Sequence, residues 1–360
     1  MRVPFTERRG ALRKEFAGSK LDSLLVTNPA TVYYLTGFTG EAAALLLSET
    51  RCTLVTDGRF QVQAREETSG VRIVLQKGAL FSSAGEILRT AGKQTTGFDP
   101  NRLTLAQFRA LRRGSGARCK WKAAPGLPEK LRGRKDVMEI AQMRRAAILA
   151  GEVLERAMRL LKPGVREFEV AAEIEYQMRK SGASGPAFET IVAFGKRGAL
   201  PHARPTAKQL RKNELVVLDL GAILGHYCSD ITRTVFVGRA PERIRRWYRA
   251  VLEAQSAAIA AVKAGAACGD VDAAARGVLT SRRLDGHFVH STGHGLGLEV
   301  HEDPRIARGQ KRRLEPGNVV TIEPGVYFAG VGGIRIEDDV VVHADETEVI
   351  TRVPRDLIEL

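Results

Sequence analysis

The sequence predicts an α+β fold in two domains, the second of which consists of two related α+β halves. Three observations support this prediction. Residues 123–128 contain proline and glycine without apolar periodicity, which is typical of a linker. Before them, short apolar runs alternate with helical stretches, and after them a helix–helix–strand order occurs twice. A chain of 360 residues is long enough for two domains. We therefore expect domains at 1–124 and 136–360, with a linker at 125–135.

The first domain is predicted to be small and of the α/β type. Its apolar runs have the length of buried strands. They cover residues 24–27, 43–47, 52–56 and 71–75. Residues 1–135 carry 24 Lys+Arg against 11 Asp+Glu, a net charge of +13 that could serve nucleic acid or an acidic partner. No aromatic–basic RNA-binding motif accompanies this charge, so we favour a solvated surface and do not expect nucleic acid.

The second domain is predicted to open with helices. Residues 137–161 place Ile140, Met143 and Leu154 near one face, and the helix stops at a Lys-Pro-Gly sequence. Helices are also expected at 166–180, 241–263 and 270–283, with Pro241 in a first turn and Asp270 as an N-cap. Strands are expected at 190–194, 215–220, 231–237, 319–328 and 334–342.

The recurring order in the second domain indicates an internal duplication. Residues 210–219 align with residues 314–323 position for position, and the helix-ending residues 162–165 align with 263–266. The period of about a hundred residues is too long for a solenoid. We therefore expect two related halves within one domain, and each half supplies a carboxylate at the same place.

The bulk composition indicates a folded protein without a membrane segment. The chain is 44% hydrophobic and 27% charged, and no stretch is long and apolar enough to cross a bilayer. The N-terminal residues lack a long apolar segment, so we expect a cytoplasmic protein. The four cysteines are widely spaced and form no Cys-x-x-Cys pair, which argues against a zinc ribbon or a disulfide scaffold.

Four carboxylates and one imidazole in the second domain form a candidate set of ligands for two divalent metal ions. Asp219 and Glu323 each end an apolar run, so their side chains should be largely buried, and buried charges must be paired or bound to metal. His294 lies among glycines that permit close backbone approach. The whole candidate set is Asp219, Asp230, His294, Glu323 and Glu337.

Hairpin geometry supports this clustering. A tight turn at Leu224-Gly225 would place Asp219 directly opposite Asp230. A turn centred on Gly330 would likewise place Glu323 opposite Glu337. Like-charged carboxylates at such positions destabilise a sheet unless a cation lies between them.

An oxygen-rich set with one imidazole favours manganese, with cobalt, zinc or iron as alternatives. Two such ions in a bridged pair would lower the pKa of a bridging water and hold a hydroxide ready to attack a carbonyl. The sequence therefore predicts a hydrolase.

Several segments together resemble the "pita-bread" metallopeptidases, and in particular aminopeptidase P (Xaa-Pro aminopeptidase) and prolidase (Xaa-Pro dipeptidase). Residues 28–40 and 56–60 resemble the creatinase-type N-terminal domain, so the likeness covers nearly the whole chain. The C-terminal segments that carry it are Asp219-Leu-Gly, Tyr227-Cys-Ser-Asp-Ile-Thr-Arg-Thr-Val235, Gly293-His-Gly-Leu-Gly-Leu-Glu-Val-His-Glu-Asp-Pro304, Thr321-Ile-Glu-Pro-Gly-Val-Tyr327 and Gly333-Ile-Arg-Ile-Glu-Asp338.

The resemblance implies a pita-bread catalytic domain, a creatinase-like N-terminal domain that helps to wall the substrate site, and a homodimer. It also implies a division of the ligands between the metals. Asp219 and Asp230 would bind one ion and His294 the other. Asp230 and Glu337 would bridge them, and Glu323 would complete the second site.

Further site residues are expected around the metals. By resemblance, His202 and His301 flank the ions and could steady an oxyanion or contact the peptide, and His290 is also a site histidine. Arg335 lies two residues before Glu337, so on a strand it shares that residue's face and could order the carboxylates. Tyr327 could line the site or belong to the core.

Glu323 is the best candidate for a proton shuttle from the attacking water to the leaving proline nitrogen. The predicted function is a metal-dependent Xaa-Pro aminopeptidase whose peptide substrates carry proline in second position. The first alternative is Xaa-Pro dipeptidase, and the second is a non-catalytic peptide- or nucleic-acid-binding protein of the same fold. Methionine aminopeptidase fits less well, because such enzymes normally lack this N-terminal domain and Arg335. Creatinase fits less well, because it works without the metal ligands that this chain retains.

Overall fold

The computed structural model describes residues 3–360. Its chain forms two compact units, of which the first ends at Arg132 and the second begins at Gly133. This division falls inside the predicted linker, residues 125–135. Part of that segment is helix α6 (Leu127–Arg132), which belongs to the first unit.

The first unit contains a mixed sheet in the order β4-β3-β2-β1-β5-β6. The four apolar runs that predict strands correspond to β1 to β4, whereas β5 and β6 are additional strands. The strands are β1 (Ser23–Val26), β2 (Ala43–Ser48), β3 (Cys52–Thr56), β4 (Arg72–Leu75), β5 (Gln94–Phe98) and β6 (Cys119–Ala123). The α-helices are α1 (Phe5–Gly18), α2 (Pro29–Thr36), α3 (Gln61–Glu67), α4 (Leu80–Thr90), α5 (Leu105–Ser115) and α6.

The burial of strand β2 shows that this sheet is covered on both faces. Its residues from Ala44 to Leu47 are all buried, and continuous burial along a strand requires a layer on each side. On one face Leu46 packs with Leu88 of α4 and Leu111 of α5.

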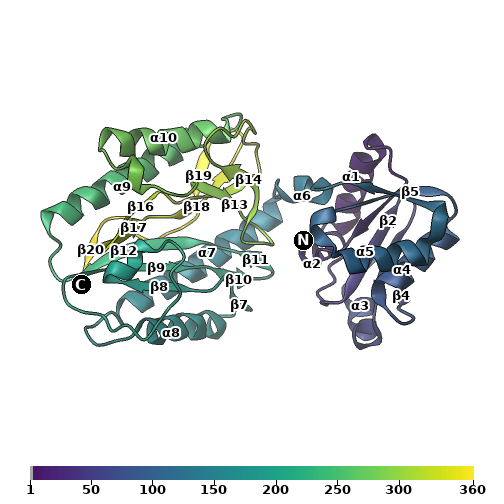
Figure 1. The fold of residues 1–360 in the computed structure, drawn as a ribbon, viewed down its shortest axis with the longest axis horizontal. Helices are drawn as coiled ribbons and strands as arrows, with labels where there is room; N and C mark the ends of the chain where they lie inside the picture. Colours follow the sequence, from purple (N-terminus) through teal and green to yellow (C-terminus); the bar gives the residue numbers. More distant parts are fainter. Residues whose placement is uncertain (1–2) are drawn as a thin grey trace. The chain divides into compact units, whose positions relative to one another are not determined.

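The second unit repeats helices and strands in the predicted order (Figure 1). Its α-helices are α7 (Val137–Met158), α8 (Glu167–Lys180), α9 (Glu242–Ala261) and α10 (Cys268–Ser281). Strands of the first part are β7 (Gly185–Pro186), β8 (Ile191–Phe194), β9 (Glu214–Leu220), β10 (Ala222–Leu224), β11 (Tyr227–Cys228) and β12 (Ile231–Val237). Later strands are β13 (Gly293–Gly295), β14 (Glu302–Ile306), β15 (Val319–Ile322), β16 (Gly325–Phe328), β17 (Gly332–Arg335), β18 (Asp338–Val342), β19 (Thr347–Val349) and β20 (Ile358–Glu359).

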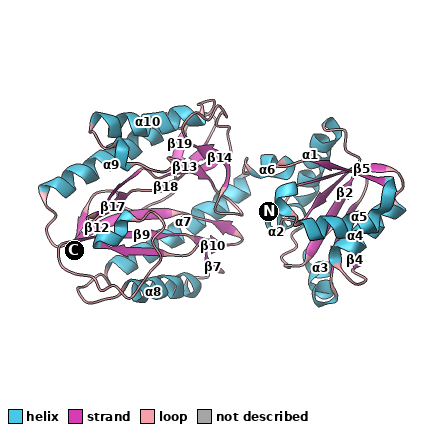
Figure 2. Cartoon of the chain, viewed as in Figure 1, coloured by secondary structure: helices cyan, strands magenta, loops and turns pink. Residues whose placement is uncertain are grey.

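The two helix pairs of the second unit lie on opposite sides of its strands. Residues of α7 and α8 share one core with β8, β9 and β12. Residues of α9 and α10 share another core with β15, β17 and β18. Figure 2 shows the strands between α8 on one side and α9 and α10 on the other. The curved sheets thus form a layer that is covered by helices from both halves.

Matching backbone hydrogen bonds confirm the internal duplication. In the first half (residues 137–237), the amide of Gly164 donates to Leu210 O at 2.9 Å. In the second half (residues 242–342), the amide of Gly265 donates to Leu314 O at 2.8 Å. The reverse bonds, from Leu210 to Val165 and from Leu314 to Ala266, are both 2.8 Å long.

The helix starts follow the sequence in one case and depart from it in two. Asp136 and Glu139 form a capping box at α7. The predictions for Pro241 and Asp270 were wrong, because Pro241 is the N-cap of α9 and Asp270 lies in the first turn of α10. The amides of the first two residues of α10, Cys268 and Gly269, donate to Arg312 O and Gln310 O, so the helix starts earlier than its sequence indicates.

The cysteines form no disulfide within residues 3–360, where all four are buried free thiols. Within residues 3–360, no helix combines the length and the apolar character that crossing a membrane requires.

Candidate metal centre

The first hairpin brings Asp219 and Asp230 to one face of the sheet, but in a register that differs from the prediction. Asp219 pairs with Thr232, and the turn residues are Gly225 and His226, both with positive φ. The predicted direct pairing was therefore wrong by two residues. Because side chains alternate with a period of two, this shift leaves both aspartates on the same face.

The second hairpin has the predicted register. Gly325 pairs with Arg335, and Ile322 pairs with Asp338. These pairs flank Glu323 and Glu337, so the turn is centred on Gly330, whose φ is 76°. The two glutamates lie at matching positions between the flanking pairs.

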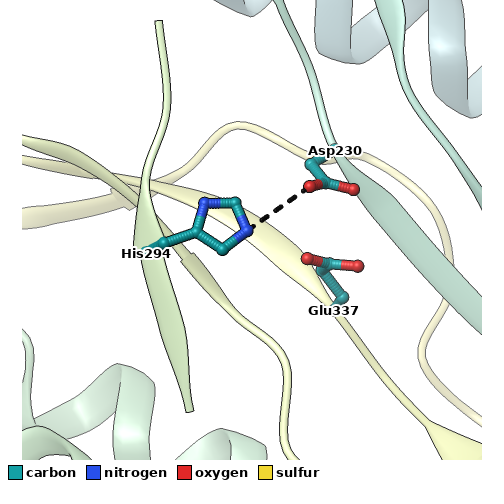
Figure 3. A group of neighbouring side chains, drawn as sticks. All are labelled: Asp230, His294 and Glu337. Atoms are coloured by element: carbon teal, nitrogen blue, oxygen red, sulfur yellow. Dashed lines mark ion pairs between the residues drawn. The ribbon is translucent and has the colours of Figure 1, made fainter. Parts of the chain in front are cut away.

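Three of the predicted ligands converge closely. One ligand atom from each of Asp230, His294 and Glu337 lies within 4.8 Å of the others. Figure 3 shows the two carboxylates facing each other and the His294 ring pointing at Asp230. His294 Nε2 is 3.7 Å from Asp230 Oδ2 and 3.5 Å from Glu323 Oε1. Glu323 thus joins the same group.

Asp219 is held beside this group by Arg335. The guanidinium Nη2 donates to Asp219 Oδ2 at 2.5 Å, while Asp219 Oδ1 is buried and has no hydrogen-bond partner within residues 3–360. Arg335 Nε donates to Thr232 Oγ1 at 3.0 Å, and Thr232 donates in turn to Glu337 Oε2 at 2.5 Å. Arg335 therefore orders carboxylates from both halves.

His290 and Tyr327 extend this network. Arg335 Nη1 donates to the Tyr327 hydroxyl at 2.6 Å, and that hydroxyl is 2.8 Å from His290 Nε2. His290 Nδ1 is 3.9 Å from Glu323 Oε2. Both predicted substrate-binding residues are thus next to the carboxylates.

His202 and His301 are exposed residues at the edge of the same cluster. The rings of His294 and His301 lie 4.4 Å apart between centroids. Arg335 Nη1 donates to Pro201 O at 3.3 Å, which brings the neighbouring His202 to the cluster. Burial and the charge of His202 lower the pKa of His301. The structure therefore brings together every site residue that the sequence predicts.

Burial and mutual repulsion perturb the acids strongly. Burial and the negative charges of Glu337 and Asp219 raise the pKa of Asp230 well above its usual range. Burial and the charges of Glu323 and Asp219 raise the pKa of Glu337 in the same way. Burial raises the pKa of Glu323 to about 7. It lowers the pKa values of His294 and His290 to about 4, so both imidazoles are neutral and able to act as ligands or acceptors.

This set of donors fits divalent metal ions. Carboxylates that repel one another in a buried site need cations between them, and an unpartnered buried oxygen such as Asp219 Oδ1 offers a free ligand atom. Carboxylate oxygens and neutral imidazole are hard-to-borderline donors that suit first-row divalent metals.

Sequence reasoning missed several residues that support the ligands. Thr321 accepts a hydrogen bond from the amide of His294, and Asp339 accepts one from the amide of Asp230. Strand alternation is a usable signal for two of the missed residues, since Thr232 follows Asp230 by two and Thr321 precedes Glu323 by two.

Two buried carboxylates anchor the segments that carry histidines. In the first half, Glu167 accepts hydrogen bonds from Phe194 N, Arg197 Nε and Thr206 N at about 2.9–3.0 Å, and so fixes both ends of the His202 loop (residues 195–206). In the second half, Asp272 accepts from Thr292 N at 3.2 Å and from Arg276 Nε at 2.7 Å. Arg276 also donates to the carbonyl of His290 at 2.6 Å.

Two family models match the chain and cover most of it. Residues 141–344 match the model described as metallopeptidase family M24, and residues 8–133 match the creatinase/prolidase N-terminal domain. The chain belongs to metallopeptidase family M24. The duplicated halves around the acid cluster are the pita-bread catalytic domain of this family, and the protein is a metallopeptidase.

Full-length M24 relatives carry peptidase names. The Xaa-Pro dipeptidase of Pyrococcus furiosus is 35% identical over 98% of this chain and 99% of its own. A solved Xaa-Pro dipeptidase from Bacillus anthracis has a TM-score of 0.95 and 38% identity over 99% of this chain and all of its own. An X-Pro aminopeptidase from Thermotoga maritima has a TM-score of 0.88 and 34% identity over 96% of this chain and all of its own.

Proposed function

We propose that this M24 metallopeptidase is a metal-dependent Xaa-Pro dipeptidase (prolidase). The observation that carries the proposal is the likeness, over the full length of both chains, to the dipeptidases of Pyrococcus furiosus and Bacillus anthracis. The sequence alone favoured an aminopeptidase with dipeptidase as the alternative. The relatives favour the dipeptidase. Because the Thermotoga relative is named an aminopeptidase, aminopeptidase activity is the competing outcome of the test.

In the proposed enzyme, Asp219, Asp230, His294, Glu323 and Glu337 hold two divalent metal ions, with manganese as the expected metal. When bound, such ions act as Lewis acids and provide an activated water at neutral pH. The buried network of Arg335 and Thr232 supports this role, because it fixes carboxylates of both halves in place before any ligand binds.

Glu323 is the proposed proton carrier. It lies between His294 and His290, at 3.5 Å and 3.9 Å, and a carboxylate beside bound metal ions can take up and release a proton. It would accept a proton from the attacking water and deliver it to the proline nitrogen. That nitrogen belongs to a tertiary amide and needs a proton in order to leave.

The exposed imidazoles of His202 and His301 are proposed to contact the substrate. Each can donate a hydrogen bond to the oxygen that becomes negatively charged during attack on the carbonyl. Tyr327 and His290 also line the cluster, and the hydrogen bond from Arg335 fixes the tyrosine hydroxyl.

Hydrolysis of matched peptides tests the proposal. Chelator-stripped protein is assayed with and without Mn²⁺ on Ala-Pro, on Ala-Pro-Ala and on Ala-Ala as a control without proline. We expect Mn²⁺-dependent cleavage of Ala-Pro with little cleavage of the other two. Comparable or faster cleavage of Ala-Pro-Ala would make the protein an aminopeptidase, and cleavage of no peptide with any of several metals would indicate a binding protein. Sedimentation of the same sample tests the expected homodimer.

A further inference from the structure

A concave site lies in the second unit, lined by residues outside the acid cluster. It is an open cleft of about 1030 Å³ between the start of α8, the start of β9 and the start of α9, beside the β16–β17 turn. None of its lining residues belongs to the predicted metal ligands or site histidines. Its volume matches that of pockets for small-molecule ligands. We name it the basic cleft after its charged residues, Arg166, Lys196, Lys208, Arg211, Arg243 and the single acid Glu214.

The charge of this cleft is concentrated and incompletely neutralised. Glu214 is already taken, since Lys208 Nζ lies 2.7 Å from its Oε2 and the amide of Arg211 donates to the same oxygen at 3.0 Å. The side chains of Lys196, Arg211 and Arg243 form no ion pair within residues 3–360. Three cations that line one cavity without a carboxylate partner attract an anion to it.

The surplus is not a property of the whole second unit. Residues 136–360 carry 32 Lys+Arg against 30 Asp+Glu, so this part of the chain is nearly neutral. Arg166 is paired with Glu169 at 3.5 Å and Lys208 with Glu214, so the local surplus consists of the other three cations. By contrast, the basic character of the chain as a whole comes from residues 1–135, where the net charge is +13.

The start of α9 adds a second, independent source of positive potential. Its N-cap is Pro241, which offers no side-chain cap, and Pro241, Arg243 and Ile244 line the cleft. The amides of Glu242 and Arg243 have no partner inside this 20-residue helix, whereas the amide of Ile244 donates to Pro241 O at 2.9 Å. These two amides and the helix dipole favour negative charge at this end, where the carboxylate of Glu359 also accepts a hydrogen bond from Ala240 N at 2.7 Å.

The apolar part of the lining limits the kind of anion. Phe168 is 43% exposed, and it lines the cleft together with Phe236 and Leu215. An aromatic side chain that is exposed beside cations can stack on a planar group that is attached to a phosphate. Arginine forks match phosphate oxygens in pairs. We propose that the basic cleft binds a multiply phosphorylated small molecule of nucleotide size.

The test measures binding of ATP and of inorganic tripolyphosphate to the full chain by equilibrium dialysis at low salt. Excess chelator is present, so that phosphates cannot bind through metal ions. The test variant is Lys196→Ala/Arg211→Ala/Arg243→Ala. The matched control is Lys180→Ala/Arg159→Ala/Arg308→Ala, which removes three exposed charges that do not line the cleft. Equal unfolding midpoints for both variants and the wild type verify folding.

We expect at least one of the two ligands to bind the wild type and the control, and the cleft variant to bind it about 100-fold more weakly. Preference for ATP that disappears in Phe168→Ala identifies a nucleotide as the ligand, whereas equal binding of both identifies a polyphosphate. Equal binding to the cleft variant and the control, or no binding to the wild type, overturns the proposal.

Discussion

The two halves of the second unit share a backbone plan but supply different chemical groups. The same pair of hydrogen bonds joins the helix-ending segment to the strand in both halves. The first half then contributes Asp219 from β9, Asp230 directly before β12, and an exposed histidine on a loop. The second half contributes two glutamates and the neutral imidazoles of His290 and His294.

This difference separates what the duplication fixes from what it leaves free. The shared backbone sets where the strands end and which face of the sheet the carboxylates lie on. Each half therefore places two acids in the same cluster. Proton-carrying capacity is unequal, because Glu323 and the buried histidines belong to the second half. Arg335 connects the halves by holding Asp219 of the first and, through Thr232, Glu337 of the second.

Removing one acid from either half should have the largest effect. Asp230 and Glu337 each immediately precede a strand, β12 and β18, and the changes Asp230→Asn and Glu337→Gln preserve side-chain shape while removing a charged ligand. We expect each to lower turnover of the Xaa-Pro substrate by about 1000-fold or more, with loss of bound metal. Bound metal by atomic spectrometry and steady-state turnover are measured on the same sample. Full metal content with near wild-type turnover in either variant would contradict the ligand assignment.

The buried loop anchors should show a smaller and unequal effect. Glu167→Gln weakens the hold on the His202 loop, and Asp272→Asn weakens the hold on the segment that leads to His294. We expect kcat to fall about 10- to 100-fold in both, as is typical of groups that orient site residues. Metal affinity should fall only in Asp272→Asn, since the His202 loop carries no predicted ligand.

A metal titration followed by kcat measurements separates the two anchors. His202→Ala serves as the benchmark, because it removes the side chain that Glu167 positions and should lower kcat while metal stays bound. Equal loss of metal affinity in Glu167→Gln and Asp272→Asn would show that the two loops do not differ in the way the structure indicates.

The pH dependence of stability should report the acids after metal removal. The raised pKa values of Asp230, Glu323 and Glu337 mean that the folded state holds protons that the unfolded state has lost, so stability falls as pH rises. The lowered pKa values of His290 and His294 act in the opposite direction below about pH 6.5. Between about pH 6.5 and 8, only the acids contribute.

We therefore expect the unfolding midpoint of chelator-treated protein to fall between pH 6.5 and 8. Added Mn²⁺ should remove this slope, because bound cations stabilise the ionised carboxylates. A midpoint that stays constant or rises across this range without metal would show that the acids are ionised in the folded protein at pH 6.5.

The hairpins also show how far the sequence could predict this site. The register of the second hairpin followed from the single glycine at 330, whereas the first has two candidate turns one residue apart. Only the structure shows that His226 accepts a positive φ, which shifts Asp230 by two positions but keeps its face. The predicted ligand set is unaffected by this error, because a shift of two residues leaves a side chain on the same face of the strand. The anchors Glu167 and Asp272 were out of reach, since their partners Thr206 and Thr292 lie 39 and 20 residues away in loops without a pattern.

Matched glycine substitutions compare the two turns and should give the smallest effect. Gly225 and Gly330 both have positive φ, so alanine costs about 1–2 kcal/mol at either position. A Cβ at Gly330 enters open space, whereas one at Gly225 would lie 2.6 Å from Gln142 Nε2. Moving Gln142 breaks its hydrogen bond to Leu224 O, which adds about 1 kcal/mol.

Calorimetry of the full chain measures this difference, and the transition that shifts on adding Mn²⁺ marks the second unit. The unfolding midpoint of Gly225→Ala should lie a further 2–4 °C below that of Gly330→Ala. In a unit of this size, a difference of about 1 kcal/mol in stability shifts the midpoint by that amount. Gly225→Ala should also lower metal affinity more, because its turn sets the position of Asp230, whereas Glu323 and Glu337 are held by strand pairs on both sides. Equal midpoints would mean that Gln142 moves without cost, and that helix α7 does not help to fix the register of the first hairpin.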